Sequence, residues 1–268
     1  MTFFTSDGRR TPSNNFRVFG DSRQHYYQLK QPVTNYREIL SNSVEFGNVP
    51  PEISANDFKV ACEKLKEEIS FNPNFANLLN GVHVPFICNK NESVRDLGKD
   101  LVEFDLLNYQ KLFNKIHPEY HFKATLQGNS ELPGNIELDS RSRYDEFLDA
   151  CYAGVVIGWY FPQALQEFDV ESQRQQMLEL PRVKNICLSG GIDILAALIG
   201  SPNLLISEDF YAPILCLSSY VHSDPRLVLL MKSYGPHMEF WCMSQMLTKE
   251  TTQVSEQWAG GITFYHIL

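Results

Sequence analysis

The stretch that decides the fold class is VKNICLSGGIDILAALIG, residues 183–200, in which two glycines separate two apolar runs. If both runs are helical, the glycines join two packed helices and the chain is mostly α-helical. If the first run is a strand, the same residues form a strand–loop–helix unit. The segments on either side have helical patterns, which favours the two-helix interpretation, with Ser189 or Asp193 capping the second helix.

A strand–loop–helix interpretation has a functional meaning. Four residues resemble the phosphate-binding loop of N-type ATP pyrophosphatases, whose pattern is SGG-x-D-S: Ser189, Gly190, Gly191 and Asp193. In that family the glycine N–H groups and the positive end of the helix hold a pyrophosphate. The resemblance implies a nucleotide-dependent enzyme that grips phosphate with these four residues. The chain departs from the pattern at Ile194, where a hydroxyl residue is expected, and only 75 residues follow Asp193. Phosphate binding is therefore the alternative interpretation.

Helical periodicity dominates the segments before this stretch. Ser54 is a capping residue before ANDFKVACEKLKEEIS (55–70), in which apolar residues recur at three- and four-residue steps. A second helix is expected over about 101–116. A third is expected over RYDEFLDACYAGVVIGWYF (143–161), which is apolar on nearly all sides after its first turns. Such a helix belongs at the centre of a fold.

The fold class expected from these patterns is mostly α, a multi-helix globular bundle with at most one small β-hairpin. Two segments after residue 180, DPRLVLLMKSYG (224–235) and PHMEFWCMSQMLTKE (236–250), are expected to be successive antiparallel helices. Any β structure is expected in 118–140, which is rich in Gly, Pro and Asn, and in 82–90.

The expected organisation has four parts: an irregular N-terminal arm (1–35), a helical N-terminal half (36–117), a loop or hinge (118–140) and a helical C-terminal half (141–268). A single domain is the alternative. The arm is expected to pack along the body, because disordered segments are usually poor in aromatic residues. Its apolar anchors are Phe16, Val18, Phe19, Tyr26 and Tyr27.

Composition indicates a soluble, cytoplasmic protein. The formal net charge is −9, which disfavours binding to nucleic acid. No apolar run approaches the roughly 20 residues that span a bilayer, so no membrane span is expected. The first residues lack the pattern of a secretory signal peptide. The cysteines are expected to be reduced core thiols, at positions 62, 88, 151, 187, 216 and 242.

No catalytic, metal or cofactor site is expected. HPEYH (117–121) places two histidines four residues apart, but Pro118 interrupts a helix there and no third ligand is evident. Cys216, His222 and Asp224 have the residue types of a nucleophilic triad, but Cys216 lies in an apolar segment, where a thiol is usually inert.

The segment MEFWCMSQM (238–246) is rich in methionine and aromatic residues. Methionine-rich surfaces adapt to partners, whereas a helix this apolar is often part of a core. Both alternatives stay open. Met238, Trp241 and Met243 are the candidate contacts with another protein.

The chain combines an expected mostly helical, acidic body rich in Asn and Gln with the polar stretch TKETTQVSEQ (248–257) and the apolar tail ITFYHIL (262–268). In these features it resembles uncharacterised effectors that intracellular bacteria secrete through a type IV system, and the resemblance covers about twenty residues. The resemblance implies a C-terminal secretion address formed by Glu250, Thr251, Thr252, Ser255, Glu256 and Ile267. The function expected is that of a soluble helical protein-interaction module without catalysis of its own, with secretion into a host cell as a further alternative.

Overall fold

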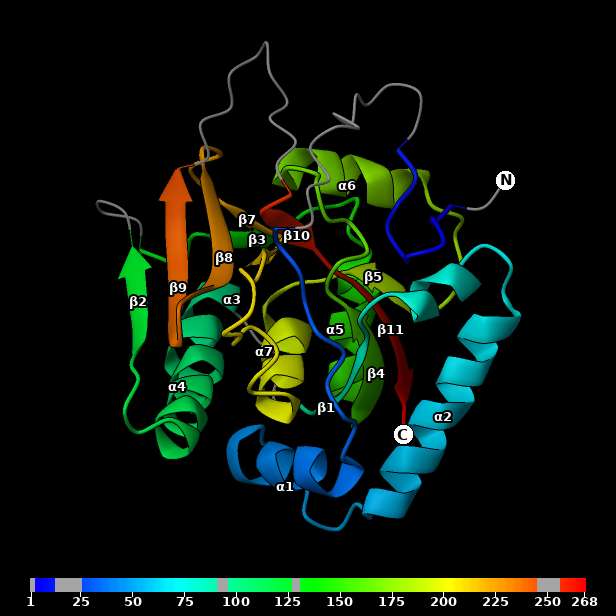
Figure 1. The fold of residues 1–268 in the computed structure, drawn as a ribbon, viewed down its shortest axis with the longest axis horizontal. Helices are drawn as coiled ribbons and strands as arrows, with labels where there is room; N and C mark the ends of the chain where they lie inside the picture. The colour runs from blue at the N-terminus through cyan, green and yellow to red at the C-terminus, as the bar shows by residue number, and fades with distance from the viewer. Residues whose placement is uncertain (1–2, 13–25, 91–95, 127–130, 245–255) are drawn as a thin grey trace.

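The computed structural model describes residues 3–12, 26–90, 96–126, 131–244 and 256–268. These residues form an α/β structure with three sheets (Figure 1). The helices are α1 (Tyr36–Phe46), α2 (Ala55–Phe71), α3 (Leu97–Asp100), α4 (Leu106–Ile116), α5 (Tyr144–Ala153), α6 (Val170–Glu179) and α7 (Gly191–Gly200), with a 3₁₀ turn η2 (Ala76–Asn80) and a π turn η3 (Leu101–Asp105).

The first sheet has four antiparallel strands in the order β1 (Val84–Cys88), β4 (Val156–Phe161), β11 (Ile262–Ile267) and β5 (Ile186–Leu188). The second has the order β10 (Trp258–Gly260), β6 (Ile214–Cys216), β8 (Leu227–Tyr234), β9 (His237–Ser244) and β2 (Phe122–Leu126). In this mixed sheet β2 pairs with β9, and β10 with β6, in parallel. The third sheet is the pair β3 (Ile136–Leu138) and β7 (Tyr220–His222).

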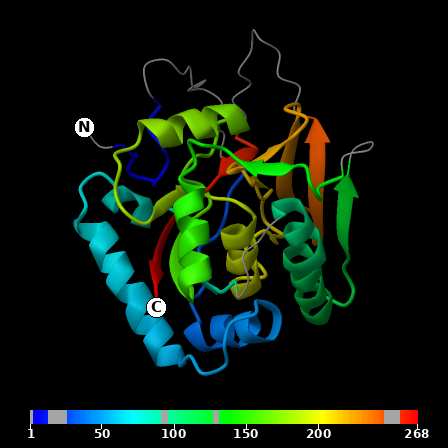
Figure 2. The same ribbon diagram turned by 180° about the vertical axis from the view of Figure 1, so that it is seen from behind.

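The two larger sheets enclose α7, every residue of which is buried. In Figure 1, α7 lies between β8 and β9 on one side and β4 on the other. One hydrophobic cluster joins α4, α5 and α7 to the facing sides of both sheets. A second cluster packs α1 and α2 against the opposite face of the four-stranded sheet, as the view from behind also shows for α2 (Figure 2).

The expected mostly α-helical bundle is wrong, and the segment 143–161 shows why. Its first part is α5, which ends at Gly154. The rest is β4, a fully buried strand that pairs with β1 on one side and β11 on the other. Valine, isoleucine and aromatic residues suit a buried strand. A short apolar run has no periodicity that separates a buried strand from a buried helix.

The two helices expected after residue 224 are the antiparallel strands β8 and β9 instead. Gly235 and Pro236 connect them, and Gly235 has a positive φ of 57°. Buried and half-buried residues alternate along β9, which is the strand period of two. The sequence does not reveal this alternation, because both faces of the strand carry apolar side chains.

Other expectations are confirmed. The helix after Ser54 is α2, and the Ser54 hydroxyl accepts a hydrogen bond from the Asp57 N–H at 3.1 Å. The helix expected over 101–116 is η3 followed by α4, and the strand expected in 82–90 is β1. No hairpin forms within the described part of 118–140, because β2 pairs with β9 and β3 pairs with β7.

The expected N-terminal and C-terminal halves share one sheet and one core, since β1 pairs with β4. Within the arm, Phe4 is buried and the Arg9 guanidinium lies 3.2 Å from the Glu167 carboxylate. Tyr27 forms a bridge with Tyr211. Phe16, Val18 and Phe19 lie outside the described residues. Of the helices described, none has the length and apolar character needed to cross a membrane.

Candidate functional site

The SGGID segment adopts a strand–loop–helix geometry, as the phosphate alternative requires. Strand β5 ends at Leu188, Ser189 and Gly190 form the loop, and α7 begins at Gly191. The two-helix interpretation of this segment is therefore wrong. The loop is nevertheless closed to solvent, because all of its residues are buried. Both glycines are needed for close packing: an added Cβ would lie 2.8 Å from the Tyr144 ring at Gly190 and 2.8 Å from the Tyr220 ring at Gly191.

Side chains of the protein itself accept hydrogen bonds from the Gly190 and Ile192 N–H groups at this helix end. The Gly190 N–H donates to Asp193 Oδ1 at 2.8 Å, and the Ile192 N–H donates to the Tyr144 hydroxyl at 3.0 Å. That hydroxyl in turn donates to Asp193 Oδ1 at 2.9 Å. Thr263 Oγ1 donates to the second carboxylate oxygen at 2.5 Å. The N–H groups of Gly190 and Ile192 are thus already paired within the protein, and together with the burial of the loop this disfavours phosphate binding here.

Burial raises the pKa of Asp193 above its ordinary value, against the opposing effect of the hydrogen bonds from Thr263, Gly190 and Tyr144. A raised folded-state pKa means that this carboxyl contributes stability below its unfolded pKa of 3.8, and that the contribution is lost as pH rises through the folded pKa.

We expect the pH dependence of stability to reveal this effect. The difference in unfolding free energy between wild type and Asp193→Asn should fall as pH rises above about 4, with a limiting slope of about 1.4 kcal/mol per pH unit, until the pH reaches the folded-state pKa of Asp193. Urea titrations of both proteins at several pH values measure this difference, in which the contributions of other groups cancel. A difference that stays constant with pH would show that burial does not raise the pKa of Asp193.

The three residues expected to contact a partner lie on opposite faces of β9. Met238 is fully buried and faces the main core, so it is not available to a partner. Trp241 and Met243 are half-buried and lie on the outer face of the five-stranded sheet, beside Trp258 and a small cluster that includes Leu230. The segment is a strand and not the expected helix, and the alternation of its side chains separates these residues.

Neighbouring side chains hold the Trp241 ring in place. The Lys232 ammonium lies 4.0 Å from the ring centroid, and the indole N–H donates to Glu239 Oε2 at 2.7 Å. Lys232 and Glu239 also form an ion pair at 3.2 Å. A cation over the ring and a bonded indole restrict its rotation, which lowers the entropic cost of using it as a contact surface.

Strand β2 lies next to this surface and is the edge of the sheet. Among the described residues it pairs with β9 alone, and both views of the fold place it at the margin of the molecule (Figures 1 and 2). Lys123, Ala124 and Leu126 are exposed. The Met238 N–H donates to the His121 carbonyl at 3.1 Å. The odd-numbered residues of β2 therefore turn their backbone N–H and C=O groups to β9. The alternation of a parallel ladder then turns the backbone N–H and C=O of Ala124 to the free edge.

The histidines considered for a metal do not form a site. The rings of His121 and His237 stack with centroids 3.8 Å apart, and His117 Nε2 lies 2.7 Å from the Asn203 side-chain oxygen. Within the described ranges, no group of three or more His, Cys, Asp or Glu side chains is arranged to hold a metal ion.

The triad considered from residue types does not assemble as a nucleophilic site. Burial raises the pKa of Cys216 to about 12, so its thiol is protonated at neutral pH and is a poor nucleophile. The Asp224 carboxylate pairs with Arg226 at 2.6 Å, and the Asp224 N–H donates to His222 Nδ1 at 2.9 Å. All six cysteines are buried and free of disulfides, as expected.

The free edge of β2 is the feature that sequence reasoning missed. Its segment FKATL carries only a weak alternation, and nothing in those five residues reveals that β9 is its one neighbour in the described part of the chain. Comparison of the chain with protein-family models, with curated proteins and with solved structures finds no match. The function is therefore argued from geometry.

Proposed function

We propose that this protein acts by binding another protein, an extended segment of which adds to the free edge of β2. The observation that carries the proposal is an exposed edge strand whose Ala124 backbone groups point away from its one described neighbour. Addition of a strand satisfies such groups with main-chain hydrogen bonds, and side chains of the added strand supply specificity.

The surroundings of β2 indicate the chemistry of the partner segment. Lys123 is exposed on the outer face, where an acidic side chain of an added strand is favourable. Thr125 lies between the free edge and its register partner Trp241. Because neighbouring strands are about 4.8 Å apart, a long apolar side chain on the added strand reaches across the small Thr125 to the Trp241 ring.

A second copy of this chain is a less suitable occupant than another protein. The formal net charge of −9 makes two copies repel each other, whereas Lys123 gives the edge a local positive charge. Sedimentation of the purified protein over a range of concentrations distinguishes the two occupants. Self-association that is lost on blocking the β2 edge would replace the proposed partner with a second copy.

We expect Ala124→Pro to weaken binding at the edge without unfolding the protein. Proline removes an N–H that faces the free edge, and it is tolerated at such positions of edge strands. Peptides selected on the immobilised wild-type protein from a displayed random library serve as ligands. Their affinity should fall by at least about tenfold on the proline variant, which corresponds to one or two lost hydrogen bonds.

The matched control is Ala124→Val, which keeps the backbone N–H and has a higher strand propensity. It should bind the selected peptides about as well as wild type. Trp241→Ala should weaken those peptides that carry a large apolar residue. Equal binding by wild type and Ala124→Pro, with both proteins folded by circular dichroism, would place the partner elsewhere and contradict the proposal.

Delivery of the protein as a secreted effector remains a proposal that rests on the resemblance alone. Of its proposed address, Glu250, Thr251, Thr252 and Ser255 lie outside the described residues. Glu256 is buried, and Ile267 lies at the end of β11, which runs between β4 and β5. The apolar tail is therefore a strand of the sheet in the folded protein, and the binding proposal does not depend on secretion.

A further inference from the structure

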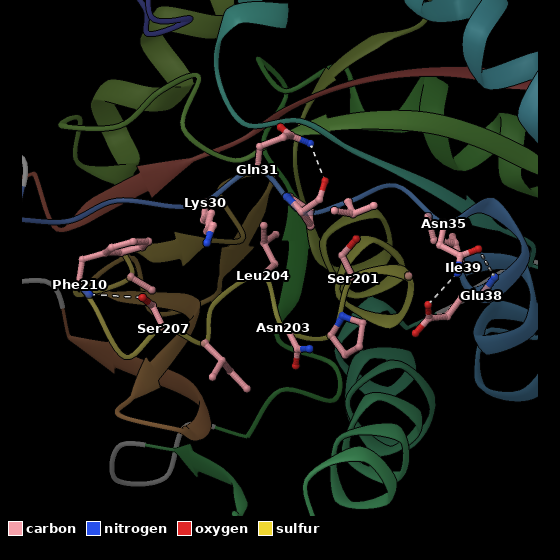
Figure 3. A pocket seen from close by; sticks show the side chains of 16 residues that line it. Lys30, Gln31, Asn35, Glu38, Ile39, Ser201, Asn203, Leu204, Ser207 and Phe210 are labelled. Atoms are coloured by element: carbon pink, nitrogen blue, oxygen red, sulfur yellow. Dashed lines mark hydrogen bonds between the residues drawn. The ribbon is translucent and has the colours of Figure 1, made fainter.

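A cavity of about 410 Å³ lies between the segment 30–39 and the segment 200–212, beside the C-terminal end of α7 (Figure 3). Its volume falls within the range of roughly 300–1,000 Å³ that is typical of small-molecule sites. None of its lining residues belongs to β2 or β9, so it is separate from the free edge proposed to bind a protein.

The two walls of the cavity are attached to each other at both ends. At one end the Gln28 N–H donates to the Tyr211 carbonyl at 2.9 Å. At the other end, the Asn42 side-chain amide donates to the Ile199 carbonyl at 3.3 Å. These bonds limit the length of the cavity and keep it open without a ligand, so little ordering is needed on binding.

The wall formed by the arm is held to the body as well. The Gln31 side-chain oxygen accepts from the His83 N–H at 2.9 Å, and its amide donates to the His83 carbonyl at 2.8 Å. This pair of bonds fixes the chain on which the neighbouring Lys30 is carried. The position of Lys30 at the cavity is therefore set by the fold.

Two charged side chains of opposite sign line the cavity, and they lie toward opposite ends of it (Figure 3). Among the described residues the Lys30 ammonium has no hydrogen-bond or ion-pair partner. The Glu38 carboxylate accepts from the Asn35 side-chain amide at 3.1 Å. A carboxylate has about four acceptor sites, so Glu38 can accept further bonds.

Apolar side chains of the lining include Leu204, Ile206 and Phe210. In Figure 3, Leu204 lies between the two charges together with Ser201, whereas Phe210 lies beyond Lys30. Leu204 is buried and belongs to the main core. Ser207 Oγ accepts from the Phe210 N–H at 3.3 Å, which holds the turn that carries the aromatic ring. The cavity thus has a cation and an anion toward its two ends, with Leu204 between them and an aromatic ring beyond the cation.

We propose that this cavity binds a short apolar peptide with free ends, whose carboxylate meets Lys30 and whose ammonium meets Glu38. A purely anionic ligand satisfies Lys30 and is repelled by Glu38, and a purely cationic ligand has the reverse problem. A dipolar ligand with an apolar body pairs with both charges and buries its side chains against Leu204 and Phe210.

The test is calorimetric titration of the full chain with leucyl-leucine, N-acetyl-leucyl-leucine and leucyl-leucinamide. Wild type should bind the unmodified dipeptide most tightly. Lys30→Met should weaken leucyl-leucine by roughly tenfold or more and leave the amide unchanged, because a charge-assisted bond is lost only where the carboxylate is present. Glu38→Gln should weaken leucyl-leucine similarly and leave the acetylated dipeptide unchanged.

Lys59→Met is the matched control, since it removes an exposed lysine of α2 that does not line the cavity. It should bind all three ligands as wild type does. Equal affinity of wild type for the three ligands, or absence of binding at millimolar leucyl-leucine, would overturn the proposal. Neither outcome bears on the β2 edge, and loss of edge binding leaves the cavity proposal intact.

Discussion

Replacement of Asp193 by alanine is expected to lower the free energy of unfolding by about 4 kcal/mol. Its carboxylate accepts hydrogen bonds from the Gly190 N–H, the Tyr144 hydroxyl and the Thr263 hydroxyl, all of them buried. Each buried donor left unpaired costs about 1–3 kcal/mol. Some relief comes from the Ser189 hydroxyl, which lies 2.9 Å from Thr263 Oγ1.

Urea titration followed by tryptophan fluorescence measures the loss, with the slope of the transition as the check on two-state behaviour. Since proteins of this kind have a total stability of about 5–15 kcal/mol, the loss is a large part of it. Asp193→Asn is the control, because its amide oxygen still accepts from Gly190 and Tyr144, and it should cost less than about 1.5 kcal/mol. Similar losses for the two variants would show that shape, and not hydrogen bonding, makes Asp193 important.

Replacement of Gly98 by alanine is expected to destabilise the fold by more than about 3 kcal/mol, as overpacking against rigid atoms does. A Cβ at this position would lie 1.8 Å from the Leu132 carbonyl oxygen and 3.0 Å from the Pro133 nitrogen. These are backbone atoms, so no side-chain rotation relieves the clash. The Asp96 carboxylate also joins the two segments, since it accepts from the Lys99 N–H at 3.0 Å and the Gly134 N–H at 2.8 Å.

Gly134→Ala is the matched control for this change. No atom lies within 4 Å of the added Cβ, but the backbone of Gly134 has a φ of +74°. Its cost should be limited to the left-handed conformation, roughly 1–2 kcal/mol. The two variants therefore separate a steric clash from a conformational penalty, and their denaturant midpoints provide the comparison. A Gly98→Ala midpoint at or above that of Gly134→Ala would contradict the expected clash.

Helices were predicted correctly where the sequence has a clear capping residue or a regular apolar stripe. Ser54 caps α2, whose apolar residues repeat at the helical period, and α4 has a similar stripe that faces the core. The burial of all six cysteines was also predictable, because a thiol among apolar neighbours is typical of a core. These features depend on residues within a few positions of one another.

The candidate sites were predictable only in part. Composition identifies Met238, Trp241 and Met243 as possible contacts, but it does not show that Met238 lies on the opposite face of the strand from the other two. The free edge of β2 and the cavity beside Lys30 have no local signal. Each depends on which segments lie side by side: β9 is the one described neighbour of β2, and the arm lies beside residues 200–212.

By itself, the sequence determined the caps, the helical stripes, the acidic net charge and the apolar runs that must be buried. The tertiary structure decided which of those runs are strands. The composition of VVIGWYF and of LVLLMKSY suits a buried strand and a buried helix equally. Strand β4 forms because β1 and β11 supply its hydrogen-bond partners from distant parts of the chain. The tertiary structure also explains the two glycines at the start of α7, because the rings of Tyr144 and Tyr220 leave no room for a Cβ there. A strand needs neighbours for its backbone groups, whereas a helix satisfies its own, so only the assembled fold could settle the choice.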